Sequence, residues 1–209
     1  MYHFFRQGQM SSRQDDMLRT NTDFLSYMDA LYSRQQGETI ILCRKFGKGT
    51  LLCSQGKPVR HIHVLRQGLV KAYHTEENAK EYILDFFGAG TILGEEEALA
   101  GRNFYLNSVE ALDDTEAYLV SVGHFRYLCD HDLAFCRLLL TEVSRRMADS
   151  TTRASLHALY PIRHALGKLL DAQEQLGLEF SKADMAAYLG IDVRSLNRLL
   201  KERADRVKR

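Results

Sequence analysis

Three consecutive glutamates, Glu95, Glu96 and Glu97, follow Gly94 in the stretch GEEEALAGRNFYLNS, residues 94–108. A Gly-Glu turn, a short helical segment and a return strand are typical of the rim of a phosphate-binding pocket. No arginine stands where a phosphate would need one. Three carboxylates could also form an acid/base or metal site, but such a run more often begins a short helix, where negative charge suits the N-terminal dipole.

His61 and His63 are a second candidate, because alternation along a strand places both imidazoles on one face. An H-x-H pair on a rolled sheet begins the metal site of cupins. A cupin would next need a Glu and then a distant His. Here Gln67 stands in the Glu region, and the second half of the roll has no His before His124. We therefore expect two histidines on a solvated strand face and no metal, with a cupin-like metal-binding barrel as the alternative function.

The C-terminal region holds a third pattern. Ser181 and Asp184 form an S-x-x-D cap that opens the helix KADMAAYL, Gly190 ends it, and Asp192 caps VRSLNRLLKERADR. A small residue at the helix contact, a glycine turn and buried apolar anchors are what a helix-turn-helix needs. These positions are Ala186, Gly190, Leu196 and Leu199. The outward face of the second helix then presents DNA-binding candidates: Arg194, Ser195, Asn197, Arg198 and Lys201.

Composition agrees with a folded protein that has a basic C-terminal region. Hydrophobic residues make up 45% of the 209 residues and charged residues 26%. From Arg145 onward, thirteen Lys and Arg face eight Asp and Glu, while the preceding residues carry fifteen against nineteen. No run is long enough for a membrane span and no signal peptide opens the chain, so we expect a cytoplasmic protein without a membrane partner. No catalytic triad, P-loop or dinucleotide fingerprint is recognisable, so we do not expect an enzyme.

The elements that must position these residues fall into an α+β arrangement. Short β-type runs separated by glycines extend from Glu38 to Val122 and predict a sandwich or rolled barrel. The runs are ETIILCRKF, GTLLCSQG, HIHVLRQG, LVKAYH, KEYILDFF, NSVEAL and TEAYLVSV. One helix, containing Phe24, Met28 and Leu31, is expected before them.

After Gly123 the apolar period becomes helical, and no Gly or Pro interrupts more than thirty residues. Steps of three and four give a heptad-like seam that predicts homodimerisation through the helix 131–158. The seam consists of Leu133, Cys136, Leu140, Val143, Met147, Ser150, Ala154 and His157. Cys129 and Cys136 share a helical face, where packing and a redox contact remain alternatives.

Pro161 disfavours helical backbone angles at the residue before it, which predicts a hinge at 159–161. The expected organisation is an N-terminal extension and helix (1–38), a β-roll (39–130), a dimerisation helix (131–160) and a helix-turn-helix domain (161–209).

Between about residues 39 and 203 the chain resembles the Crp/Fnr family of bacterial transcription regulators. The resemblance rests on SQG (54–56), VLRQGLVKAYHTEENAKEYILDFFGAGTILGE (64–95), the long helix and DMAAYLGIDVRSLNRLLK (184–201). Within the family, ILDFFGAGTILGE and AAYLG look more like the YeiL-type regulators than like the cyclic-AMP receptor. The resemblance implies a double-stranded β-roll (jelly roll) that holds an effector, a dimerisation helix, and a winged helix-turn-helix that binds palindromic double-stranded DNA. The chain given ends at Arg209, before the β-hairpin wing would appear.

The resemblance also predicts an altered effector pocket. Gly94 and Glu95 match the start of the family's phosphate-binding cassette, but its Arg-Ser pair aligns with Tyr105 and Leu106, and Arg102 stands three residues earlier. Ser150 and Thr151 fall where the long helix offers hydroxyls to a base. The predicted pocket therefore comprises Gly94, Glu95, Tyr105, Leu106, Ser150 and Thr151. We expect it to hold an unidentified effector, or its own side chains, and not to bind cyclic AMP.

Overall fold

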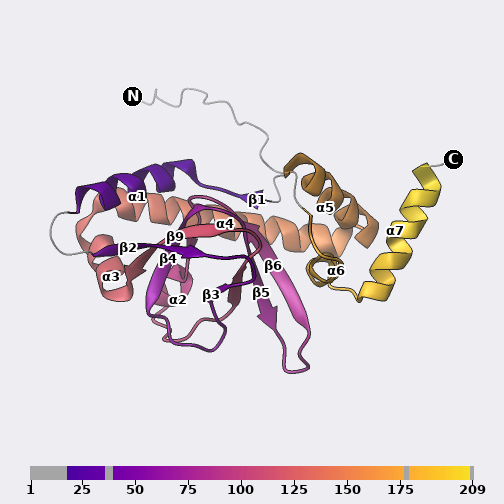
Figure 1. The fold of residues 1–209 in the computed structure, drawn as a ribbon, viewed down its shortest axis with the longest axis horizontal. Helices are drawn as coiled ribbons and strands as arrows, with labels where there is room; N and C mark the ends of the chain where they lie inside the picture. The colour runs from indigo at the N-terminus through magenta and orange to yellow at the C-terminus, as the bar shows by residue number, and fades with distance from the viewer. Residues whose placement is uncertain (1–17, 36–39, 177–178, 208–209) are drawn as a thin grey trace, which may run out of the picture.

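A computed structural model of the chain describes residues 18–35, 40–176 and 179–207. Two β-sheets face one another and form the predicted roll (Figure 1). The first has the order β2-β9-β4-β7 and the second the order β1-β6-β5-β8-β3. The first sheet contains β2 (Ile41–Phe46), β9 (Thr115–Ser121), β4 (His61–Gln67) and β7 (Ile92–Leu93). The second contains β1 (Leu18–Arg19), β6 (Glu81–Phe87), β5 (Val70–Thr75), β8 (Ser108–Ala111) and β3 (Leu51–Cys53).

The seven runs expected from the sequence all contain strands, and the mixed α+β roll is confirmed. The two-residue strands β1 and β7 were not predicted, because two residues are too few to show an alternating pattern. β1 pairs in parallel with β6, with Leu18 opposite Phe86 and Arg19 opposite Phe87. This pairing makes the N-terminal segment the edge strand of the second sheet, next to β6.

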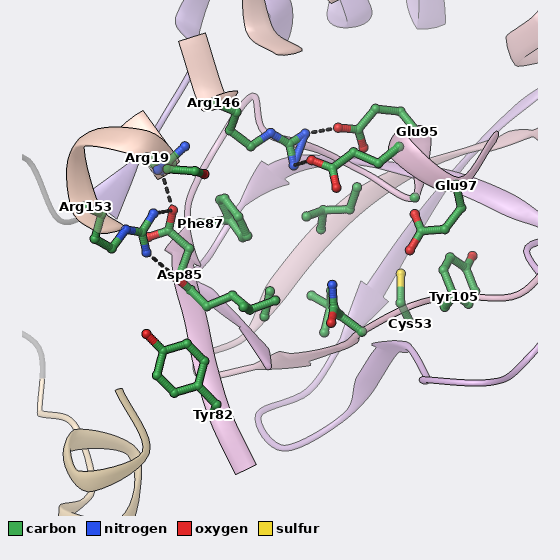
Figure 2. A pocket seen from close by; sticks show the side chains of 18 residues that line it. Arg19, Cys53, Tyr82, Asp85, Phe87, Glu95, Glu97, Tyr105, Arg146 and Arg153 are labelled. Atoms are coloured by element: carbon green, nitrogen blue, oxygen red, sulfur yellow. Dashed lines mark hydrogen bonds and ion pairs between the residues drawn. The ribbon is translucent and has the colours of Figure 1, made fainter. Parts of the chain in front are cut away.

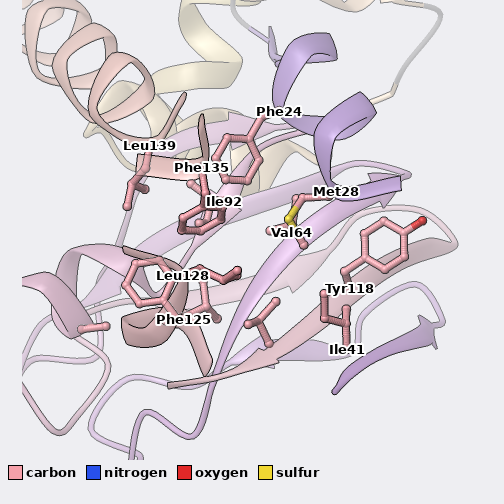
Figure 3. Packing of buried hydrophobic residues seen from close by; sticks show 13 residues of the cluster. Phe24, Met28, Ile41, Val64, Ile92, Tyr118, Phe125, Leu128, Phe135 and Leu139 are labelled. Atoms are coloured by element: carbon pink, nitrogen blue, oxygen red, sulfur yellow. The ribbon is translucent and has the colours of Figure 1, made fainter. Parts of the chain in front are cut away.

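Apolar side chains of the two sheets meet in a core inside the roll, where Leu65, Val70, Phe87 and Leu119 are buried. A second core lies between the β2-β9-β4-β7 sheet and residues of four helices, α1, α2, α3 and α4 (Figure 3). The labelled members of this second core are Phe24, Met28, Ile41, Val64, Ile92, Tyr118, Phe125, Leu128, Phe135 and Leu139. The central strand β4 is therefore covered on both faces.

Helix α1 (Thr22–Arg34) is the predicted N-terminal helix, and the Asn21 side chain caps it by accepting from the Phe24 N–H at 3.0 Å. Phe24 and Met28, four residues apart, form its buried face. Its start is fixed to the roll, because the Asn21 N–H donates to the Ala89 carbonyl. Gly90 has φ +83°, and a Cβ there would lie 1.8 Å from the Asn21 carbonyl oxygen, so only glycine allows this approach.

The long C-terminal helix of the roll is divided in two, which corrects the uninterrupted helix expected from the sequence. α3 (Val122–His131) ends and α4 (Leu133–Leu159) begins at Asp132, which has extended backbone angles. Asp132 accepts from the Phe135 N–H at 3.0 Å and from the Tyr27 hydroxyl of α1. A carboxylate that caps one helix and anchors another thus breaks the run without Gly or Pro.

Helix α4 has two different stripes. One faces the roll and is buried or largely buried, with Phe135, Leu139, Glu142 and Arg146. The other is the predicted seam. Its members Leu133, Leu140 and Met147 are exposed, whereas Cys136 and Val143 are half-buried. The side chains of Ala154 and His157 lie outside the described residues.

Three further helices follow Pro161: α5 (Ile162–Leu176), α6 (Lys182–Leu189) and α7 (Val193–Val207). α6 packs on β6, and α5 and α7 pack on α6. Phe86 of β6 stacks on Phe180, which precedes α6, with ring centroids 4.4 Å apart. The Lys71 ammonium donates to the Asp184 carboxylate at 2.6 Å, and both side chains are largely buried. The helical unit is thereby joined to the roll by an apolar core and an ion pair. Within the part of the chain that the structure describes, no helix could span a membrane.

Candidate functional site

A cavity of about 340 Å³ opens between the roll and α4 (Figure 2). The volume is in the range of small-molecule sites. Its apolar walls include Leu84, Phe87, Leu93 and Val109, and charged side chains gather at one end. The full lining is Arg19, Cys53, Ala72, Tyr82, Leu84, Asp85, Phe87, Leu93, Gly94, Glu95, Glu96, Glu97, Tyr105, Asn107, Val109, Arg146, Ser150 and Arg153.

Glu95 begins the short helix α2 (Glu95–Leu99), directly after Gly94 turns the chain with φ +86°. Its fully buried carboxylate forms an ion pair with the Arg146 guanidinium of α4. A second carboxylate, that of Glu96, lies 3.6 Å from Arg146, and the guanidinium lies over the Phe87 ring. Burial, together with the nearby charge of Arg19, lowers the pKa of Arg146 to about 10. Glu95 Oε2 and Arg146 Nε have no hydrogen-bond partner among the described residues.

Asp85 binds two arginines at the same end of the cavity. Its carboxylate accepts from Arg153 of α4 at 2.7 Å and forms an ion pair with Arg19 of β1 (Figure 2). Burial raises the pKa of Asp85, and the two guanidinium groups oppose that shift. Arg19 Nη1 is buried and has no hydrogen-bond acceptor in the described residues; Asp149 Oδ2 lies 3.6 Å away. Asp85 therefore connects the N-terminal strand, the roll and the long helix.

The other end of the cavity contains the later part of the segment that resembles a phosphate-binding cassette, with Glu97 and Tyr105. The buried Glu97 carboxylate accepts the Leu106 N–H at 2.9 Å. The Tyr105 hydroxyl donates to the His61 carbonyl at 2.7 Å, and burial raises its pKa. The Glu97 carboxylate therefore already accepts the backbone N–H of Leu106, which is one of the two positions aligned with the family's phosphate ligands. A phosphate placed here would meet a buried carboxylate.

The structure brings together four of the six predicted pocket residues: Gly94, Glu95, Tyr105 and Ser150. Leu106 and Thr151 do not line the cavity. Leu106 is exposed, and the Thr151 hydroxyl donates to the Met147 carbonyl at 3.0 Å. Arg102 is exposed and also lies outside the lining.

The expectation of a pocket without a fixed cation is wrong, because three arginines line the cavity. Arg146 and Arg153 lie seven residues apart on the stripe of α4 that begins with Phe135 and Leu139, and this spacing could have revealed them. Arg19 is contributed by β1, whose pairing with β6 has no sequence signal. None of the three comes from the cassette itself.

The expectation of two solvated histidines is also wrong. His61 is half-buried, while His63 is buried, because β4 is covered by a sheet on one face and by helices on the other. His63 Nδ1 lies 3.6 Å from the Cys53 Sγ, and burial lowers the pKa of His63 to about 4. Burial raises the pKa of the Cys53 thiol to about 12. Among the described residues, no group of three or more His, Cys, Asp or Glu side chains could hold a metal ion.

The helix-turn-helix pattern is present at α6 and α7. Ser181 caps α6 by accepting the Asp184 N–H at 3.0 Å, Gly190 takes the left-handed conformation at its end, and Asp192 accepts the Ser195 N–H at 2.8 Å. Ala186 and Leu196 are buried, as predicted for the helix contact.

Four of the five predicted DNA-contacting side chains are exposed on α7: Arg194, Asn197, Arg198 and Lys201. The fifth, Ser195, is half-buried, and its hydroxyl donates to Asp192 at 3.0 Å. The helix lies at the edge of the molecule, away from the roll (Figure 1).

Comparison with known proteins matches residues 43–132 to the cyclic nucleotide-binding domain. The chain is 24% identical over 146 residues to the regulatory protein YeiL of Escherichia coli O157:H7, covering 69% of this chain and 66% of that protein, just under two thirds of its length. It is 23% identical over 165 residues to the regulatory protein HlyX of Actinobacillus pleuropneumoniae, covering 73% of this chain and 68% of that protein.

Solved structures share the fold. The c-di-GMP responsive global regulator CLP of Xanthomonas campestris superposes with a TM-score of 0.73 at 18% identity, over 86% of this chain and 92% of that chain. A transcriptional regulator of the CRP/FNR family from Thermus thermophilus superposes with a TM-score of 0.66 at 19% identity, over 79% and 87% of the two chains. Residues 43–132 therefore match the cyclic nucleotide-binding domain, and the chain is similar in sequence to the regulatory proteins YeiL and HlyX and in fold to regulators such as CLP.

Proposed function

We propose that the chain is a DNA-binding transcriptional regulator that acts as a homodimer and senses a small molecule in its roll. The observation that carries the proposal is the α6–α7 pair, which is capped at both helix starts, turned at Gly190 and anchored by the buried Leu196. Such a pair presents the second helix for insertion into the major groove. The similarity to the regulators YeiL and HlyX supports the same function.

The exposed side chains of α7 suit the two tasks of a recognition helix. Arg194 and Arg198 can each donate two hydrogen bonds to guanine, and Asn197 can read adenine. Lys201, one turn after Arg198, suits a phosphate. The Ser195 hydroxyl donates to the capping Asp192 carboxylate, so we assign Ser195 to positioning the helix and not to base contact.

The exposed stripe of α4 supports the homodimer. Leu133, Leu140 and Met147 recur every seven residues on the face turned away from the roll. An apolar seam of this kind on a long helix suits packing against a second copy. A dimer would present two α7 helices, so we propose a palindromic operator.

The roll senses a ligand other than a cyclic nucleotide. The cassette end of the cavity is occupied by the Glu97 carboxylate on the Leu106 N–H, and the cations lie at the opposite end. The cavity nevertheless has the volume of a ligand site. One of its lining residues, Asp85, belongs to β6, which is the strand that α6 contacts.

The test compares Arg198→Ala with Arg203→Ala on the same helix. Arg203 is exposed but lies on the side of α5, with Nη2 3.6 Å from the Asp171 carboxylate. Binding is measured by fluorescence anisotropy on a duplex selected by the protein and on a random duplex. Arg198→Ala should cost about 1–3 kcal/mol on the selected duplex and less on the random one. Equal losses on both duplexes, or a larger loss for Arg203→Ala, would contradict the assignment.

A further inference from the structure

We propose that the effector is a small hydroxycarboxylate with an apolar body, and that its carboxylate binds between Arg19 and Arg146. The site is at the end of the cavity formed by β1, β6 and α4, where Glu95, at the start of the cassette, pairs with Arg146. This inference deepens the proposed sensory role of the same cavity. It uses contacts that the sequence did not predict, since Arg19 comes from the segment before the roll.

Buried polar atoms without partners show where a ligand would bind. The Arg19 and Arg146 side chains are 10% and 11% exposed, and Arg19 Nη1 and Arg146 Nε have no hydrogen-bond acceptor among the described residues. A buried donor without an acceptor is costly, so a ligand oxygen at these two atoms would be favoured. Both side chains line the cavity, and they lie on the same side of it in Figure 2.

The balance of buried charge favours a single negative charge on the ligand. Three guanidinium groups, those of Arg19, Arg146 and Arg153, form ion pairs with two fully or nearly fully buried carboxylates, those of Asp85 and Glu95. The third buried carboxylate of the lining, that of Glu97, forms no ion pair with these arginines in the described part of the chain and accepts the Leu106 N–H instead. The carboxylates of Glu96 and Asp149 that lie near Arg146 and Arg19 are half exposed and better screened. A monocarboxylate would neutralise the excess charge, whereas a dianionic phosphate monoester would exceed it.

The rest of the cavity indicates which other chemical groups the ligand carries. Glu95 Oε2 is fully buried and has no donor in the described residues, so a ligand hydroxyl next to the carboxylate would satisfy it. Phe87, Leu93 and Val109 supply an apolar wall for the body of the molecule. An α-hydroxy acid with an aromatic or branched side chain has these three features.

The test uses 4-bromomandelate, which carries a carboxylate, an adjacent hydroxyl and an apolar ring. Its controls are 4-bromomandelamide, which lacks the charge, and 4-bromophenylacetate, which lacks the hydroxyl. Calorimetry should show binding of the hydroxy acid, weaker binding of the phenylacetate and none of the amide. In a co-crystal, the anomalous signal of bromine should place the ring against Phe87, with the carboxylate at Arg19 and Arg146.

Two variants locate the charge. Arg19→Lys keeps a cation near Asp85 but removes the Nη1 donor, and it should weaken binding about tenfold to a hundredfold. Arg102→Met is the matched control, because Arg102 is exposed and outside the cavity lining, and it should leave binding unchanged. Circular dichroism of each variant confirms the fold.

Three results would overturn the proposal: no binding of 4-bromomandelate at millimolar concentration, equal binding of the amide, or a loss caused by Arg102→Met and not by Arg19→Lys. The measurement involves no DNA, so a failure here leaves the DNA-binding function to its own test.

Discussion

Replacing Leu140 by Glu should convert the protein from a dimer into a monomer without unfolding the roll. Leu140 is the middle residue of the exposed seam on α4, and Leu133 and Met147 lie one heptad before and after it. The three side chains are 64%, 61% and 73% exposed for Leu133, Leu140 and Met147. Because Leu140 does not belong to the buried stripe of α4, the substitution should cost little stability in the isolated protomer.

The expected magnitude follows from the exposed surface. Full burial of a leucine or methionine side chain contributes about 1.5–3 kcal/mol, so a side chain with roughly two thirds of its surface available contributes about 1–2 kcal/mol. Loss of Leu140 from both protomers therefore removes about 2–4 kcal/mol from the interface, before any repulsion between two glutamates. The dimer dissociation constant should rise by about thirtyfold to several hundredfold.

Sedimentation velocity across micromolar concentrations measures this change, with circular dichroism to verify the fold. Leu42→Glu is the matched control, because Leu42 is an exposed leucine on β2 that is 49% exposed and lies outside α4. The control should remain dimeric. A wild-type protein that is monomeric at micromolar concentration, or a dimer that tolerates Leu140→Glu, would refute the assignment of the seam.

Three further predictions concern the roll. Asp85→Asn leaves Arg19 and Arg153 without their shared buried carboxylate, and urea denaturation should show a loss of about 3–5 kcal/mol in the free energy of unfolding; a loss below 1 kcal/mol would contradict the burial of this cluster. His63 has a pKa of about 4 when folded against 6.5 when exposed, so the unfolded chain binds more protons between these values and stability falls as pH falls. From pH 7 to pH 5 the free energy of unfolding should fall by about 2 kcal/mol, and His63→Gln should abolish that part of its pH dependence. An unchanged pH dependence in His63→Gln would contradict the low pKa of His63. Calorimetry with cyclic AMP and cyclic GMP should show no micromolar binding, because Glu97 occupies the cassette, and a micromolar dissociation constant would disprove this reading.

The sequence predicted the parts of the fold that have a local signature. Alternating apolar residues identified the strands from β2 onward except the two-residue β7, and the Ser181 and Asp192 caps with Gly190 placed the helix-turn-helix within a residue or two. The exposure of Arg194 and Arg198 also followed from helical spacing. These features depend on neighbours within a few positions, which a single sequence displays directly.

The features that the sequence missed depend on contacts between distant segments. Arg19 enters the cavity because β1 pairs with a strand more than sixty residues later in the chain. The break at Asp132 depends on the Tyr27 hydroxyl of α1, and the burial of His63 depends on the helices that cover β4. The charge of the pocket was therefore misjudged, although its position between the roll and α4 was anticipated.

The most direct test of the central claim is selection of DNA from a random duplex pool by the full chain, followed by sequencing. A dimer that presents two copies of α7 should enrich a two-fold symmetric motif, with half-sites about one helical turn apart, and Arg198→Ala should relax the base preference at one position of each half-site. Failure to enrich any motif, or a motif without two-fold symmetry that Arg198→Ala leaves unchanged, would contradict the account.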